Sequence, residues 1–327
     1  MNCVFIRRES IENEKRAPIV PKDIKRLLDA GITVFVQSSK NRIYKDSEYE
    51  KEGAIITNEP WYSEDFTNTL ILGLKELDYL EKLDEHKHIY FSHSLKHQNG
   101  CETILHAFSS SKSLLYDFEY FTINKERYLS FGKYAGMVGA ALGVKDDLQH
   151  LRSWSSFSSL IENLGGKDPT VAIIGSDGRC GSGVKHVLDL LNIKYTCFTK
   201  KDTITGLETY DIVYNCILLD ESYTNVFFDE KTIFTKPIVI VDISCDYSKK
   251  NNPIKLYEKA TSWENPVFHY NNYVSIIAIE NLPSLLPKES SDEFSELCTN
   301  LLLSFGNDTW QRCADVYSRA INSLSKN

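Results

Sequence analysis

A glycine-rich stretch at residues 171–183, "VAIIGSDGRCGSG", has the residue types of an anion-binding turn. Four apolar residues lead into it, and "VKHVLDLL" follows at helical spacing. Between a strand and a helix, glycines let backbone N–H groups approach a phosphate, and the helix dipole favours negative charge. Gly178 and Gly181 match the second and third glycines of the G-x-G-x-x-G fingerprint, Ser176 stands at the first, and Arg179 adds a cation. The pattern predicts a dinucleotide loop, with a structural glycine turn as the alternative.

The choice between two dinucleotides depends on the end of the next strand. NAD-binding domains usually carry Asp or Glu there, about 20 residues beyond the glycines, to bind the ribose 2′-hydroxyl. Here the strand ends in "CFTKKDT", whose tip is Thr199, Lys200 and Lys201. We therefore expect no carboxylate at the tip. Two lysines would suit the 2′-phosphate of NADP, and a solvated lysine pair is the alternative.

A lysine and a histidine follow two strand-like segments of the N-terminal half. "TLILGLK" (69–75) ends in Lys75, and "HIYFSH" (88–93) ends in His93. An imidazole exchanges protons near neutral pH, and a lysine beside another cation can have its pKa lowered into a useful range. If the strands are neighbours, the two side chains converge on one edge and predict acid–base chemistry. An exposed lysine and a structural histidine are the alternative.

Other histidine spacings raise the question of a metal. His86 and His88 are separated by one residue, and His93 and His97 by three. An i, i+4 pair can bind zinc, but "HSLKH" lacks the glutamate of H-E-x-x-H, and its lysine would repel a cation. We predict no metal.

Composition indicates a globular enzyme. A length of 327 residues suggests two domains, and 42% apolar with 25% charged residues is ordinary for a globular chain. The net charge of −8 argues against a nucleic-acid partner. No apolar run approaches the ~18 to 20 residues needed to span a membrane. The N-terminus "MNCVFIRRES" has no apolar signal segment, so we expect a cytoplasmic protein without a membrane partner.

The eight cysteines are scattered singly, which argues against a zinc ribbon or a disulfide framework. Cys180 and Cys216 each follow a predicted strand and could approach one another. Separate thiols are the preferred interpretation, and a disulfide remains open.

Strands alternate with helices along the chain, which predicts parallel sheets. Predicted strands of the first half are 3–9, 32–38, 69–75 and 88–93, with an extended segment at 114–121 and helices at 21–31 and 100–113. A Gly/Ala-rich helix lies within 131–151. Beyond it we predict strands at 170–174, 194–198, 211–217 and 237–244, a helix at 183–191, and two C-terminal helices within 282–305 and 308–324.

The motifs taken together resemble a known family. "GLKE", "LYDFE", "FGKYAGMVGAALG", "GRCGSG" and "LPSLLPKE", in their order along nearly the whole chain, resemble the lysine-forming saccharopine dehydrogenases of the fungal type, in the group that includes alanine dehydrogenase. The resemblance implies an α/β fold of two Rossmann-like domains whose parallel sheets flank an interdomain catalytic cleft. The substrate domain would be 1–133 plus 290–327, and the dinucleotide-binding domain 134–289.

The implied reaction is the reversible, NAD-dependent oxidation of saccharopine to lysine and 2-oxoglutarate, by a monomer or, alternatively, a dimer. The resemblance implies that His93 exchanges the amine proton, that Lys75 activates water, and that Glu76 and Glu119 tune the lysine. The substrate-binding residues it implies are Arg16, Lys96, Glu119, Arg127 and Phe131. The cofactor-binding residues it implies are Gly178, Arg179, Gly181, Thr199, Thr203, Leu218, Glu280 and Leu282.

Two departures leave alternatives open. Thr199 stands where the family carries an Asp, and "IENLP" replaces "IDHLP", which gives Glu280 and Asn281. A related NADP-dependent imine reductase or opine-type dehydrogenase with another amino-acid partner is therefore one alternative. A non-catalytic sensor of a nucleotide or amino acid is the other.

Overall fold

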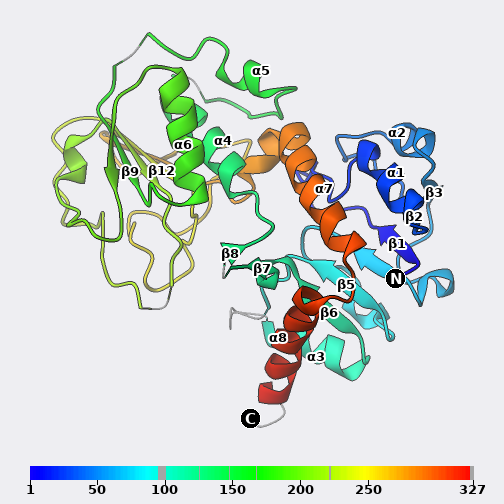
Figure 1. Cartoon of the computed structure of the whole chain (residues 1–327). Coiled ribbons are helices and arrows are strands. Elements are labelled where there is room, and N and C mark those ends of the chain that lie inside the picture. The colour runs from blue at the N-terminus through cyan, green and yellow to red at the C-terminus, as the bar shows by residue number, and fades with distance from the viewer. Residues whose placement is uncertain (95–100, 125, 147, 167, 221, 325–327) are drawn as a thin grey trace. The chain divides into compact units, whose positions relative to one another are not determined.

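The chain forms two compact units in a computed structural model, which describes all residues except 95–100, 125, 147, 167, 221 and 325–327 (Figure 1). Unit 1 comprises Met1–Ser130 with Pro287–Asn327, and unit 2 comprises Phe131–Leu286. The predicted boundaries lay after residues 133 and 289. Each unit has its own sheet and its own core.

Unit 1 is built on a six-stranded parallel sheet in the order β3-β2-β1-β4-β5-β6. The order reverses between β1 and β4, and ligands of such open sheets bind outside the strands' carboxyl ends at that reversal. The five predicted strands are confirmed in shorter form, while β3 was missed because it is a short, partly exposed edge strand. The strands are β1 (Cys3–Ile6), β2 (Thr33–Gln37), β3 (Ile55–Thr57), β4 (Leu70–Leu72), β5 (Lys87–Tyr90) and β6 (Leu114–Asp117).

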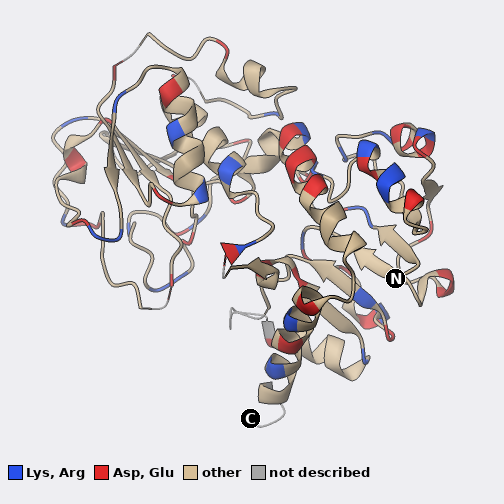
Figure 2. Ribbon diagram, in the orientation of Figure 1, with Lys and Arg blue, Asp and Glu red and all other residues tan. Residues whose placement is uncertain are grey.

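The C-terminal helices belong to unit 1 and complete its core. Its helices are α1 (Pro21–Asp29), α2 (Asp46–Lys51), α3 (Cys101–Ser110), α7 (Pro287–Leu303) and α8 (Asp308–Leu324). Ser295 of α7 joins the N-terminal segment, since its hydroxyl accepts from the Val20 N–H and donates to the Asp23 carboxylate. Acidic residues predominate in the first half of α7, whereas acidic and basic residues alternate along α8 (Figure 2).

Unit 2 has a six-stranded sheet in the order β10-β9-β11-β12-β14-β13. The first five strands are parallel, but β13 pairs antiparallel with β14, so the prediction of a wholly parallel sheet was wrong at this edge. The strands are β9 (Val171–Ile174), β10 (Tyr195–Phe198), β11 (Ile212–Asn215), β12 (Ile238–Asp242), β13 (Phe268–His269) and β14 (Val274–Ile277). The strand pair β13–β14 was not predicted, because a two-residue strand leaves no periodic pattern.

The helices of unit 2 are α4 (Gly132–Val144), α5 (Phe157–Ile161) and α6 (Arg179–Leu190). Helix α6 begins four residues earlier than predicted, so two of the loop's glycines lie inside it. A Cβ at Gly136 would overlap the Cys180 carbonyl, and one at Gly183 would overlap the Lys133 carbonyl. Glycine at these positions lets α4 and α6 touch backbone to backbone (Figure 1).

No helix in the described part of the chain is long and apolar enough to cross a bilayer.

Replacing Gly183 by alanine should separate α4 from α6, because the atom that the new methyl group meets is a backbone oxygen that cannot rotate away. We expect a loss of about 2 kcal/mol or more in unfolding free energy, measured by thermal denaturation followed by circular dichroism. Ser182→Ala, at the exposed neighbouring position, is the matched control. Equal melting of the two variants would show that the helices do not need the close approach.

Candidate active site

Lys75 and His93 follow adjacent parallel strands of unit 1. β4 pairs with β5, and each residue lies three positions beyond the end of its strand. The two loops stay joined, since the Gly73 N–H donates to the Ile89 carbonyl at 3.0 Å and the Phe91 N–H donates to the Leu74 carbonyl at 3.2 Å. The expected neighbourhood of the two strands is therefore confirmed.

His93 has an unusual backbone conformation. Its φ is 54°, in the left-handed region that few residues other than glycine adopt, and such conformations concentrate at functional positions. Its ring is stacked on Phe91 with centroids 6.3 Å apart. The neighbouring Ser92 and Ser94 hydroxyls lie 2.8 Å apart, and Ser92 donates to the Asp117 carboxylate. The loop thus holds the partly exposed imidazole in one direction.

Asp117 connects this loop to Glu119. Its buried carboxylate accepts from the Ser92 hydroxyl at 2.8 Å and from the Glu119 N–H at 2.9 Å. Burial raises the pKa of Asp117, and these hydrogen bonds oppose that shift. Sequence reasoning missed this residue, although its place at the end of β6, beside β5, was a usable signal.

Glu119 lies between a histidine and an arginine. One of its oxygens is 3.6 Å from His93 Nδ1, and the other is 2.8 Å from Arg127 Nη2. A carboxylate beside Nδ1 orients an imidazole, and a guanidinium beside a carboxylate fixes both groups. Three of the predicted site residues of unit 1 therefore form a chain of contacts, from His93 through Glu119 to Arg127.

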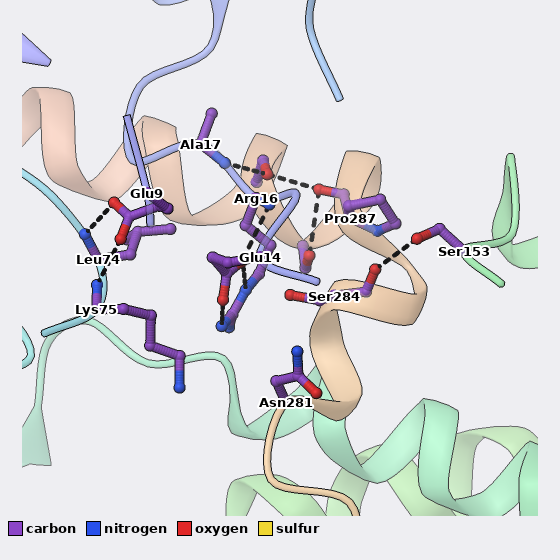
Figure 3. A network of polar contacts seen from close by, with 12 residues as sticks. Glu9, Glu14, Arg16, Ala17, Leu74, Lys75, Ser153, Asn281, Ser284 and Pro287 are labelled. Carbon is purple, nitrogen blue, oxygen red and sulfur yellow. Dashed lines mark hydrogen bonds and ion pairs between the residues drawn. The ribbon is translucent and has the colours of Figure 1, made fainter. Parts of the chain in front are cut away.

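The remaining predicted residues of this group differ in their surroundings. Arg16 is buried and forms two side-chain hydrogen bonds with Glu14, from Nε at 2.8 Å and from Nη2 at 2.5 Å (Figure 3). Glu76 is exposed, and its carbonyl oxygen accepts from Arg7. Phe131 is the residue before the first turn of α4 in unit 2, and Lys96 lies outside the described residues.

The glycine turn of unit 2 joins β9 to α6. Gly175 has a φ of +79°, and a Cβ at Gly181 would lie 2.6 Å from the Gly175 carbonyl oxygen. Gly175, rather than Ser176, therefore makes the tight bend. The Gly175 N–H also donates to the Phe198 carbonyl at 2.8 Å, which draws the turn against the end of β10. The shift of one residue explains the poor match to the fingerprint.

The end of this turn fits a pyrophosphate. Gly178 is the N-cap of α6, and exposed Arg179 is its first residue, so the unsatisfied N–H groups of the first turn begin there. Ser176 is buried, and its hydroxyl has no hydrogen-bond partner among the described residues. A phosphate oxygen would provide such a partner.

A carboxylate does lie at the tip of β10, so the expectation of none there was wrong. Asp202 folds back, and its Oδ2 accepts from the Thr199 N–H at 2.6 Å and from the Thr199 hydroxyl at 2.7 Å. These hydrogen bonds lower the pKa of Asp202. Sequence reasoning considered only Thr199, Lys200 and Lys201 and missed an acid four positions beyond the strand's last residue, Phe198.

The other predicted cofactor residues are spread over unit 2. Leu218 follows β11 and is 75% exposed. Thr203 and Glu280 are exposed, and Glu280 accepts from the Tyr247 hydroxyl at 3.1 Å. Leu282, by contrast, is buried in the core of unit 2.

A buried network beneath these loops was also missed. Asp242 at the end of β12 accepts from Asn215 Nδ2 at 2.9 Å, from the Cys245 N–H at 3.0 Å and from the Tyr257 hydroxyl at 2.5 Å. Because Asn215 and Asp242 are register partners, the network ties the loop after β11 to the loop after β12. Burial raises the pKa of Asp242.

Cys180 and Cys216 are both free thiols. Burial raises the pKa of Cys216 well above its usual value. Among the described residues, no group of three or more His, Cys, Asp or Glu side chains could hold a metal ion.

Comparison with known proteins places the chain among dehydrogenases. The sequence profile of the family "Alanine dehydrogenase/PNT, N-terminal domain" matches residues 5–138. The saccharopine dehydrogenase [NAD(+), L-lysine-forming] of Yarrowia lipolytica is 31% identical, over 97% of this chain and 97% of that protein. The chain belongs to the saccharopine dehydrogenase family. The enzyme of the same name from Emericella nidulans is also 31% identical, over 99% of this chain and 98% of its own.

A solved L-alanine dehydrogenase has the same fold, with a TM-score of 0.71, 14% sequence identity and coverage of 97% of this chain and 94% of that one. The family resemblance and the α/β fold class expected from the motifs are therefore confirmed.

Removing the Asp117 carboxylate should loosen the loop of His93. Asp117→Ala leaves the Glu119 N–H and the Ser92 hydroxyl without their acceptor, which should cost about 2 kcal/mol or more in unfolding free energy, measured by urea denaturation. Asp46→Ala is the matched control, since Asp46 also accepts from a serine hydroxyl but is more exposed. If Asp117→Ala and Asp46→Ala lower the unfolding free energy equally, the Asp117 carboxylate is not needed to hold the loop of His93.

Proposed function

We propose that this chain is an NAD-dependent oxidoreductase acting on a CH–NH group, a saccharopine dehydrogenase that forms L-lysine and 2-oxoglutarate reversibly. The observation that carries the proposal is the joined pair of loops bearing Lys75 and His93, with Glu119 beside the histidine. Support comes from the curated relatives of that name, which match almost the full length at 31% identity.

The reaction consumes saccharopine, NAD+ and water and yields lysine, 2-oxoglutarate, NADH and a proton. Bound NAD+ supplies the acceptor for the hydride that leaves the carbon beside the secondary amine. His93 accepts the proton of that amine as the C=N bond forms. Lys75, in its neutral form, takes a proton from the water that attacks the imine carbon, and later returns a proton to the departing lysine nitrogen.

Saccharopine carries three carboxylates, so its site needs cations. We assign this binding to Arg16, Lys96 and Arg127, because a guanidinium fork holds a carboxylate bidentately. Glu14 orients Arg16, and Glu119 orients Arg127 as well as His93. Glu76 and Glu119 are proposed as the carboxylates that act electrostatically on Lys75, and Phe131 is proposed to contact the substrate.

The cofactor is proposed to bind along the carboxyl edge of the unit 2 sheet, in the dinucleotide-binding domain, 134–289. Gly178, Arg179 and Gly181 would hold the pyrophosphate, and exposed Leu218 would cover an apolar ring. The remaining cofactor contacts are assigned to Thr199, Thr203, Glu280 and Leu282. Asp202 supports NAD, because a carboxylate accepts from ribose hydroxyls and repels a 2′-phosphate.

The exposed pair Lys200 and Lys201 is the feature that favours NADP instead. Comparing NADH with NADPH in the same assay separates the use of NAD from the use of NADP. We further propose that the protein is a monomer and that it is cytoplasmic; the free thiols of the described cysteines fit the reducing conditions of the cytoplasm.

Loss of either proton-transferring group should slow the reaction without abolishing NADH binding. His93→Gln and Lys75→Met should each lower kcat by about 10²- to 10⁴-fold, measured as NADH oxidation with lysine and 2-oxoglutarate across pH. His106→Gln and Lys87→Met, at exposed positions of α3 and of the amino end of β5, are the controls. Unchanged kcat in the first two would refute the assignment, and NADH binding without turnover in the wild type would favour a sensor.

Asp202→Asn should weaken NADH binding about tenfold and reduce the preference for NADH over NADPH, because the charge that repels a 2′-phosphate is lost. Both affinities are measured by nucleotide fluorescence titration. The matched control is Asp211→Asn, because Asp211 receives the same two hydrogen bonds from the N–H and hydroxyl of Thr170. These residues lie at the amino ends of the strands, away from the proposed cofactor site. Equal NADH affinity in both variants would remove Asp202 from the cofactor site.

A further inference from the structure

A buried charged pair follows β1 and holds the loop that carries Lys75. The Glu9 carboxylate accepts from two consecutive backbone N–H groups, that of Leu74 at 2.8 Å and that of Lys75 at 3.0 Å. Figure 3 shows Glu9 facing these two residues. Each oxygen takes one N–H group, so the carboxylate fixes both peptide units.

Arg7 holds the same loop through its carbonyl groups. Its Nη2 donates to the carbonyl oxygen of Lys75 and, at 3.3 Å, to that of Glu76. Its Nη1 lies 3.3 Å from Glu9. The pair therefore binds Lys75 on both sides, with Glu9 at its N–H and Arg7 at its C=O.

The Arg7 guanidinium lies directly against Gly73 of this loop. A Cβ at Gly73 would overlap the Arg7 guanidinium in its present position, so the guanidinium uses the space that the absence of a side chain leaves there. The Phe91 N–H donates to the Leu74 carbonyl at 3.2 Å, two residues before His93. The backbone that Arg7 and Glu9 hold is therefore continuous, through hydrogen bonds, with the loop of the histidine.

Stability alone does not account for this arrangement. Arg7 is 4% exposed and Glu9 is 9% exposed, and burying an ion pair often brings no net stabilisation over an apolar pair of similar volume. What the pair provides is a fixed backbone. The amino group of a lysine lies at the end of a flexible four-carbon stem, so its place depends on that backbone, and a displacement of ~1 Å can cost a reaction ~100-fold.

The geometry points to Arg7 and Glu9 as positioning residues that set the location of the Lys75 amino group for catalysis, an inference that rests on the proposed function. Both follow β1, and Lys75 follows β4, so the pair bridges the point where the strand order reverses. Neither residue is assigned a contact with the reacting atoms, and their effect passes through Lys75.

A double-mutant cycle tests this inference, using NADH oxidation with lysine and 2-oxoglutarate. Glu9→Gln preserves the shape but leaves one of the two N–H groups without an acceptor, and should lower kcat about 10- to 100-fold. In the Lys75→Met background the same change should alter kcat less than about threefold, because there is no amino group left to position. Arg7→Lys, which keeps the charge but loses the fork, should show the same dependence on Lys75 with a smaller loss.

Arg42→Gln is the matched control, since Arg42 is a buried arginine of unit 1 that donates to the Gln37 carbonyl at 2.8 Å. Its effect should be the same in both backgrounds. The inference is overturned if Glu9→Gln lowers kcat equally in both backgrounds, or if Glu9→Gln and Arg7→Lys both fail to fold. Full kcat in the Lys75→Met variant alone would instead refute the proposed function.

Discussion

The parallel pairing of β1, β4 and β5 is the constraint on which the candidate active site of unit 1 depends. Strands that run parallel end at one edge of the sheet, so the segments after them meet there. Arg7 and Glu9 continue from β1, Lys75 from β4 and His93 from β5. The site is thus assembled from three loops that are far apart in sequence. Backbone hydrogen bonds beyond the strand ends keep the loops after β4 and β5 side by side.

Buried carboxylates hold the loops after the strands in both units. Glu9 accepts from the N–H groups of the β4 loop, Asp117 from the β5 loop and from Glu119, and Asp242 from the loops of unit 2. A buried carboxylate is costly unless several donors satisfy it. Each one therefore fixes a particular backbone geometry, which is what a site for proton or hydride transfer requires.

Much of this could be read from the sequence. The apolar runs before Lys75 and His93 identified their strands, and the motif order identified the family. The parts that were missed depend on tertiary packing. Asp202 reaches the tip of β10 only by folding back onto Thr199, and the bend at Gly175 differs from the fingerprint by one residue. Neither follows from periodicity, because both are set by contacts between loops.

The most direct test of the account is the identity of the product. The protein should convert lysine, 2-oxoglutarate and NADH deuterated at the transferable position of its nicotinamide C4 into saccharopine that carries one deuterium on the carbon derived from the 2-oxo group, detected by mass spectrometry. Saccharopine with that label would establish both the substrate pair and the hydride transfer. Absence of labelled saccharopine, with protein that binds NADH, would contradict the proposed reaction.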